Sequence, residues 1–182
     1  MEIEVKAKVE DLEETKKKLL ELGAEFTGSE QQDDSYFKPK GKEMEEQGPG
    51  SFIVRIRKEK EGSFLTIKEM TDRSGVWKEY ETTVGNAEET RKMVEVMGYS
   101  HIFDINKARE FGQLNGINLC IDDVKQLGKY LELEIHGEDA DDAKKKMLEL
   151  FSKLGIKEEQ IEHRGYARII SEKMGIKFKG VK

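Results

Sequence analysis

The chain begins Met1-Glu2-Ile3-Glu4-Val5-Lys6-Ala7-Lys8, and this stretch decides the fold. Its apolar residues alternate with charged ones, which predicts a β-strand with one aliphatic face and one ionic face. From this strand alone two interpretations are open. The ionic face lies in water, as in an ordinary antiparallel strand, or it lines a cavity where the carboxylates hold a metal and the lysines hold an anion. Repetition of the pattern in later strands would favour the cavity.

The composition favours one domain with an unusually ionic surface or interior. Of 182 residues, 36% are hydrophobic and 38% are charged, which still permits a core at this length. Since 32 Lys and Arg face 38 Asp and Glu, the net charge is −6, and we expect no nucleic-acid partner. We expect a single domain over residues 1–182, built from two similar halves at about 1–98 and 99–175, with a flexible tail at 175–182.

The cysteine content and the N-terminus predict where the protein works. A single cysteine, Cys120, excludes an internal disulfide and fits a reducing cytoplasm. The charged N-terminus has no apolar signal region, and no apolar run approaches the roughly 18 residues of a membrane span. We therefore expect a cytoplasmic protein with no membrane partner.

Helix and strand signals alternate along the rest of the chain. Asp11, Asn86 and Asp139 are expected N-caps of three helices, and residues 160–174 also have a helical composition. Residues 39–51 hold both prolines and three glycines and predict a mobile loop. The expected extended segments are residues 24–38, 52–57, 64–68, 76–84, 101–111, 119–122 and 131–136.

The ionic face of the first strand recurs on these segments. Its acids are Glu2, Glu4, Glu79, Glu81, Asp122, Glu132 and Glu134, and its bases are Lys6, Lys8, Arg55, Arg57, Lys68, Lys107 and Arg109. The helices need apolar surface and should cover the aliphatic faces. If the sheet closes on itself, the charges point inward, which we favour over an open sheet with one solvated face.

A charged interior of this kind suits a specific ligand. Desolvating so many ions would cost several kcal/mol each without partners, so the interior should be wet and functional. Clustered carboxylates suit a hard divalent cation such as Mg²⁺ or Mn²⁺, and several Arg and Lys residues suit a chain of phosphates. The interior therefore predicts a site for a metal-bound nucleoside triphosphate or polyphosphate.

An ordered set of motifs resembles the CYTH superfamily, which is named for class IV adenylyl cyclases and thiamine triphosphatases. Glu2-x-Glu4-x-Lys6 looks like the ExExK signature of that family, and the resemblance extends over about residues 1–166. The further motifs are Asp34-Ser35-Tyr36-Phe37, Arg55-x-Arg57, Leu65-Thr66-Ile67-Lys68, Glu79-x-Glu81, Lys107-x-Arg109 and the stretch 121–134. One departure is Gly165-Tyr166, where the family often has Ser-Tyr.

The resemblance implies an α+β fold, a closed eight-stranded antiparallel β-barrel or triphosphate tunnel with helices packed outside. It also implies roles for the residues. The implied metal ligands are Glu2, Glu4, Asp122, Glu132 and Glu134; the implied phosphate ligands are Lys6, Arg55, Arg57, Lys68, Lys107 and Arg109, and Lys8 shares their face. The catalytic set is Glu2, Glu4, Lys6, Glu79 and Glu81, in which Glu79 and Glu81 match family acids without individual roles.

Three functions remain open on this resemblance. A class IV adenylyl cyclase-like enzyme, which the length and the Asp34–Phe37 segment favour, would convert ATP to cyclic AMP and pyrophosphate. A hydrolase would act on inorganic triphosphate or thiamine triphosphate. A non-catalytic nucleotide or polyphosphate binder would not need the surplus carboxylates. A homodimer is a further tendency of the family.

Overall fold

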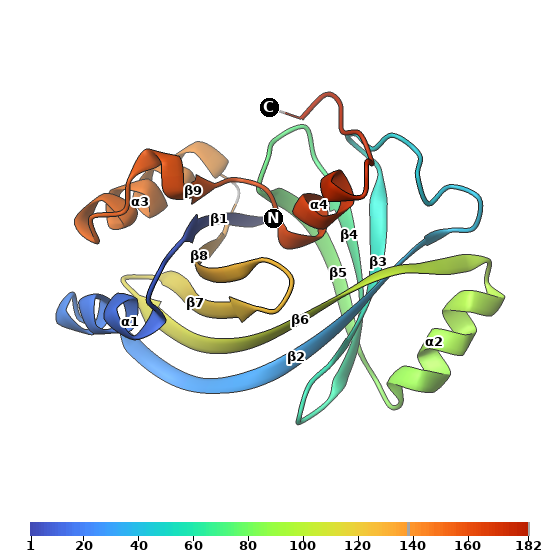
Figure 1. Cartoon of the computed structure of the whole chain (residues 1–182), viewed down its shortest axis with the longest axis horizontal. Helices are drawn as coiled ribbons and strands as arrows, with labels where there is room; N and C mark the ends of the chain where they lie inside the picture. Colours follow the sequence, from blue (N-terminus) through green and yellow to red (C-terminus); the bar gives the residue numbers. More distant parts are fainter. Residues whose placement is uncertain (138, 182) are drawn as a thin grey trace.

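The computed structural model describes residues 1–137 and 139–181 as a strongly curved sheet with helices around it (Figure 1). The strands are β1 Glu2–Lys8, β2 Glu25–Pro39, β3 Phe52–Lys58, β4 Ser63–Met70, β5 Val76–Val84, β6 Tyr99–Leu114, β7 Ile117–Val124, β8 Gly128–His136 and β9 Ile161–Glu162. The α-helices are α1 Leu12–Glu21, α2 Ala87–Val96, α3 Ala140–Lys153 and α4 Tyr166–Lys173, and Glu158–Gln160 form a short 3-10 turn.

Eight of the strands form a closed antiparallel ring, as the sequence predicts. The strand order is β5-β4-β3-β2-β6-β7-β8-β1, and β1 pairs again with β5. The strands of each predicted half are contiguous in the ring, and the two halves join where β2 pairs with β6 and where β1 pairs with β8. The tight β6–β7 turn follows from Asn115-Gly116, both of which adopt positive φ (49° and 79°) as the mirror-image hairpin turns require.

Two strands share the second edge of β1. Near its start, Glu2 and Ile3 pair with β5, and further along Lys6 and Ala7 pair with β9. The expected helix over 160–174 was therefore wrong at its beginning. Its first residues pair with β1 in extended conformation, and the helix starts only after Gly165.

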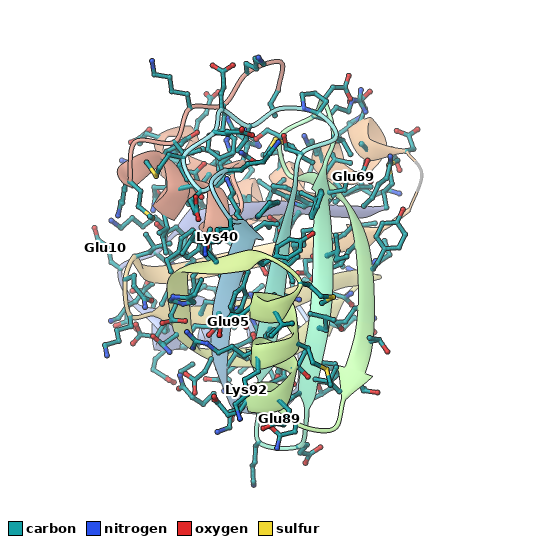
Figure 2. All side chains as sticks on the ribbon, turned by 90° about the vertical axis from the view of Figure 1, so that its right-hand side faces the viewer. Glu10, Lys40, Glu69, Glu89, Lys92 and Glu95 are labelled. Atoms are coloured by element: carbon teal, nitrogen blue, oxygen red, sulfur yellow. The ribbon has the colours of Figure 1, made fainter. Side chains whose placement is uncertain are left out.

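Helices α1, α2 and α3 cover the aliphatic outer faces of the ring. Their N-caps are the predicted ones, and the side chains of Asp11, Asn86 and Asp139 accept backbone hydrogen bonds from the first turn. Helices α1 and α3 pack over β1, β7 and β8, with Phe151 and Met147 of α3 fully buried. Helix α2 packs over β3, β4 and β6, with its charged side, including Glu89, Lys92 and Glu95, turned outward (Figure 2).

Helix α4 and the tail after it lie across one end of the ring. Tyr166 and Ile169 pack with Tyr36, Phe103 and Tyr130, which come from inside the ring. Beyond α4, the backbone of Gln47 in the 40–51 loop pairs with Phe178 of the tail, and the two segments run side by side at the top of Figure 1. One end of the interior is therefore closed by α4, the loop and the tail.

None of the helices in the two described ranges is long and apolar enough to cross a membrane.

Gly75 lies just before β5 and contacts β1 where the ring closes, and we predict that this glycine is needed for stability. Gly75 has φ +70°, its carbonyl accepts a hydrogen bond from Glu4 N (2.8 Å), and an added Cβ would lie 2.3 Å from Glu4 O. Gly75→Ala should therefore lower the free energy of unfolding by about 2 kcal/mol or more, measured by urea denaturation. Gly28→Ala is the matched control, since nothing lies within 4 Å of its added Cβ. Equal stabilities of the two variants would contradict the proposed role of Gly75 in closure.

Candidate functional site

The inner faces of the ring enclose a cavity of about 870 Å³, which we call the central cavity. This volume is typical of sites for ligands of nucleotide size. Charged side chains from β1, β3, β4, β5, β6 and β8 line it. They are Glu2, Glu4, Lys6, Arg55, Arg57, Lys68, Glu79, Glu81, Lys107, Arg109, Glu132 and Glu134. The ionic face predicted from the sequence is thus the lining of one cavity.

Three carboxylates in this cavity are placed to hold a metal ion. Glu4 lies opposite Glu134 in the β1–β8 register, and ligand atoms of Glu2, Glu4 and Glu134 all lie within 4.8 Å of one another. Oxygen donors at this spacing fit a hard divalent cation. Glu132, Glu134 and the thiol of Cys120 form an overlapping group of the same spacing.

The charge state of Glu134 supports this fit. Burial, followed by the nearby Glu132 carboxylate, raises the pKa of Glu134 to about 8, and no salt bridge to Glu134 is found among the described residues. Burial likewise raises the pKa of Glu2. A divalent cation would supply the positive charge that Glu134 lacks and would add to that of Lys68 beside Glu2.

Lysines on either side of the carboxylates complete the network. Lys6 Nζ lies 2.8 Å from Glu4 and 2.9 Å from Glu132. Burial would lower the pKa of Lys6, but these two carboxylates outweigh it and raise the pKa. Lys68 Nζ lies 3.1 Å from both Glu2 and Glu79, and its pKa is raised for the same reason.

Arg55 organises the wall formed by β3, β4 and β5. Its guanidinium lies 3.0 Å from both Glu79 and Glu81, and it donates to the hydroxyl of Thr66, which in turn donates to Glu81 (2.8 Å). All four side chains stand on neighbouring strands with inward-facing register. Glu79 and Glu81 therefore fix Arg55 and Lys68 in place, a role for which the sequence offered no assignment.

Asp34 on β2 is the hub of a second cation group. It accepts two hydrogen bonds from Arg57 (2.6 and 2.8 Å) and one from Lys107 (3.1 Å). Although burial opposes it, these cations hold the pKa of Asp34 well below its usual range. Burial, and then the nearby Arg57, lowers the pKa of Lys107 to about 8. A further anion beside Lys107 would therefore stabilise its charged form.

Asp122 holds Arg109 rather than lining the cavity. Arg109 forms a bidentate ion pair with Asp122, donating hydrogen bonds of 2.7 and 2.6 Å, and it also donates to Glu132 at 2.6 Å. The hydroxyl of Tyr166 donates to Asp122 at 2.8 Å, so Asp122 is fully buried. Asp122 therefore lies behind Arg109, away from the Glu2–Glu4–Glu134 group.

The structure brings together all the predicted site residues except Asp122 and Lys8. Lys8 is exposed at the end of β1 and is not part of the cavity lining. The alternation that places Lys6 inward continues to Lys8, which still pairs with Tyr130 of β8 but is the last residue of β1. The charged face of β1 that points into the cavity therefore ends at Lys6, although the alternation in the sequence runs on to Lys8.

Four contributors to the site are not among the predicted site residues, although three of them stand in motifs that carry the family resemblance. They are Asp34, Thr66, the indole of Trp77, which donates to Glu4 (3.1 Å), and Tyr166. Asp34, Thr66 and Trp77 could have been identified by their place on the inward faces of β2, β4 and β5, whereas Tyr166 stands on α4, where no strand alternation indicates it. Gly165 also has a local reason, because a Cβ there would lie 3.0 Å from Glu4 Oε1 and 3.2 Å from Trp77. A serine at 165 would displace Glu4 or Trp77.

The raised pKa of Glu134 predicts pH-dependent metal binding. A proton on Glu134 competes with a cation below about pH 8, so Mn²⁺ affinity should rise with pH and level off above 8. The rise should approach tenfold per pH unit between about 6.5 and 7.5, measured by Mn²⁺ electron paramagnetic resonance titration. Glu134→Gln should weaken binding and flatten this slope, and exposed Glu149→Gln should leave both unchanged. The same slope in all three proteins would exclude Glu134 as a ligand.

Comparisons with known proteins agree with this geometry. Residues 1–166 match the CYTH domain family. The chain is 29% identical over 174 residues to the protein named "Putative adenylate cyclase MJ0240" of Methanocaldococcus jannaschii, covering 93% of this chain and 98% of that one. The PH1012 protein of Pyrococcus horikoshii OT3 is 30% identical, with TM-score 0.81 and coverage of 92% and 98%. A Hippeastrum protein described as a "putative adenylyl cyclase" with a dominant triphosphatase activity shares the fold, at TM-score 0.66, 14% identity and coverage of 98% and 97%. This chain belongs to the CYTH domain family.

Proposed function

We propose that this protein is a metal-dependent enzyme that acts on a triphosphate bound in the central cavity. The observation that carries the proposal is the juxtaposition of the Glu2–Glu4–Glu134 group with six buried or half-buried cations on the same lining, namely Lys6, Arg55, Arg57, Lys68, Lys107 and Arg109. A phosphate chain needs several cations at successive positions, and a metal bridging it needs adjacent carboxylates.

The cations would bind the phosphates by exchanging partners. Each is held in place by a carboxylate, as Arg55 is by Glu79 and Glu81, so it is oriented before the ligand arrives. Charges that are oriented in advance stabilise developing negative charge at little cost in reorganisation. Arginine forks suit two-point contacts with phosphate oxygens, and Lys6, Lys68 and Lys107 act as point charges.

We infer that Glu2, Glu4 and Glu134 would hold Mg²⁺ or Mn²⁺. When bound, such an ion polarises phosphate oxygens and lowers the pKa of an oxygen nucleophile. The chain's own residues then have distinct roles: Trp77 and Lys6 orient Glu4, and Lys68 orients Glu2 and Glu79. Tyr166 keeps Asp122 on Arg109, which faces the phosphates.

Our first candidate reaction is formation of cyclic AMP from ATP. In this reaction the 3′-hydroxyl of ATP gives up its proton to water and its oxygen bonds to the α-phosphorus. The bond from the α-phosphorus to the oxygen that bridges to the β-phosphorus breaks, and pyrophosphate leaves with that oxygen. The name of the Methanocaldococcus jannaschii relative, which the chain matches over nearly its full length, supports this candidate.

Our second candidate is hydrolysis of inorganic triphosphate or thiamine triphosphate. The residues that bind the triphosphate serve either reaction, and the activity described for the Hippeastrum protein supports hydrolysis on this fold. A pure polyphosphate binder is disfavoured because the Glu2–Glu4–Glu134 group offers nothing to an anion.

The candidates differ in their products. Purified protein should be incubated separately with ATP, tripolyphosphate and thiamine triphosphate, each with Mg²⁺ or Mn²⁺, and the products separated by chromatography. Cyclic AMP with pyrophosphate from ATP supports the cyclase. Free phosphate without cyclic AMP supports the hydrolase, and tight binding without turnover under either metal would contradict an enzyme.

Glu4→Gln should abolish metal-dependent turnover with little loss of stability. The amide keeps an oxygen that accepts from Trp77, but it removes the charge that binds the metal, so we expect at least a ~10²-fold loss in kcat. Exposed Glu10→Gln, labelled in Figure 2, is the control. A variant that unfolds at a much lower urea concentration yet keeps its activity would show that Glu4 is structural.

A further inference from the structure

A second, smaller cavity lies beyond α4, at the end of the ring that the loop and the tail close. Its volume is about 30 Å³. The residues around it come from the end of β2, from β3, β4 and β5, from α4, from the 40–51 loop and from Phe178 of the tail. We call it the Lys38 chamber. It shares the side chains of Ile53, Lys68, Trp77 and Ala167 with the central cavity.

Lys38 is the unusual residue of this chamber. It follows Asp34 and Tyr36 on the inward face of β2, and only 3% of it is exposed. Its Nζ has no hydrogen-bond partner among the described residues. Burial lowers the pKa of Lys38 to about 8, and the carboxylate of Glu45 offsets this only partly. A buried ammonium without a partner costs several kcal/mol, so an anion beside it would be stabilising.

The other polar groups around the chamber also favour an anion. Arg168 and Lys68 add two positive charges to the lining. Ser51 uses its oxygen to accept from Gly48 N (3.0 Å), which leaves its hydroxyl proton free to donate. No carboxylate lines the chamber within the described ranges. The acids that pair with Arg168 (Glu172) and with Lys68 (Glu2 and Glu79) lie outside it, so Lys38 is the lining cation without such a partner among the described residues.

The 40–51 loop and the tail cover the chamber, and backbone hydrogen bonds hold these two segments together. Gln47 N donates to Lys177 O (2.8 Å), and Lys179 N donates to Gln47 O (2.9 Å). Phe178 lies between these contacts and under the guanidinium of Arg168, at 4.8 Å. A short pairing of this kind can open locally at small cost, which gives solvent ions a route to Lys38.

We propose that the Lys38 chamber is a second anion site, which takes one inorganic oxyanion of phosphate size. Its volume corresponds to about two or three water positions, enough for a single tetrahedral group and too small for a nucleotide or a triphosphate. The site is separate from the central cavity, and the proposal does not rest on the proposed function. Lys68 links the two sites, because it also contacts Glu2 and Glu79.

Crystals soaked in selenate, an analogue of sulfate and phosphate, test the proposal directly. Anomalous scattering should show selenium within hydrogen-bonding range of Lys38 Nζ in the unaltered protein. The peak should vanish in Lys38→Met and persist in Lys40→Met, the control on the exposed residue that follows β2 (Figure 2). Water alone beside Lys38 while selenate occupies the central cavity would overturn the proposal, as would a peak that survives in Lys38→Met.

A measurement in solution tests whether the anion binds the chamber outside the crystal or only at the high concentration of a crystal soak. Sulfate should raise the unfolding temperature of the Lys40→Met protein more than that of Lys38→Met, because the central cavity contributes equally in both. From the lost charge-assisted hydrogen bonds we expect sulfate to bind the chamber at least about tenfold more weakly in Lys38→Met. Lys38→Met should fold, since it removes an unpartnered charge. Identical sulfate dependence of the two variants would overturn the proposal.

Discussion

The buried ammonium of Lys6, held between Glu4 and Glu132, shows the constraint on which the whole interior depends. Closing the sheet turns the ionic faces of the strands inward, and a buried charge is costly unless an opposite charge lies beside it. The pairs therefore connect different strands, as Lys6 of β1 meets Glu132 of β8 and Arg55 of β3 meets Glu79 of β5. The same pairs that make the closed ring tolerable also fix the side chains that face the ligand.

This pairing supports the proposed binding of metal and phosphate in the interior. A metal ion would replace the ammonium groups as the partner of the carboxylates, and phosphates would replace the carboxylates as partners of Lys and Arg. Among the charged residues that line the central cavity, Glu134 and Lys107 each have a pKa shifted to about 8, towards the neutral form. They mark where the network has most to gain from metal and from phosphate.

Local pattern predicted the strands and their charged faces, and the resemblance to the CYTH superfamily implied that eight of them close into a ring. The alternation from Glu2 to Lys6, repeated in Arg55–Arg57 and Lys107–Arg109, identifies inward faces, and the N-caps and the Asn115-Gly116 turn place the elements. Contacts between distant strands were not predictable in this way. Asp122 alternates like a cavity residue, yet Arg109 and Tyr166 cover it, and Lys8 continues the pattern beyond the end of the cavity. The pairing of β9 with β1 depends on an edge that β5 leaves free, which no local signal encodes.

The central claim is that metal and triphosphate replace the protein's own ion pairs in the central cavity. A crystal structure with Mn²⁺ and tripolyphosphate tests it most directly. The account predicts manganese on Glu2, Glu4 and Glu134, phosphate oxygens on Arg55, Lys68 and Lys107, and Lys6 drawn away from Glu4 towards phosphate. Manganese or tripolyphosphate bound outside the ring, with the ion pairs of the interior intact, would contradict it.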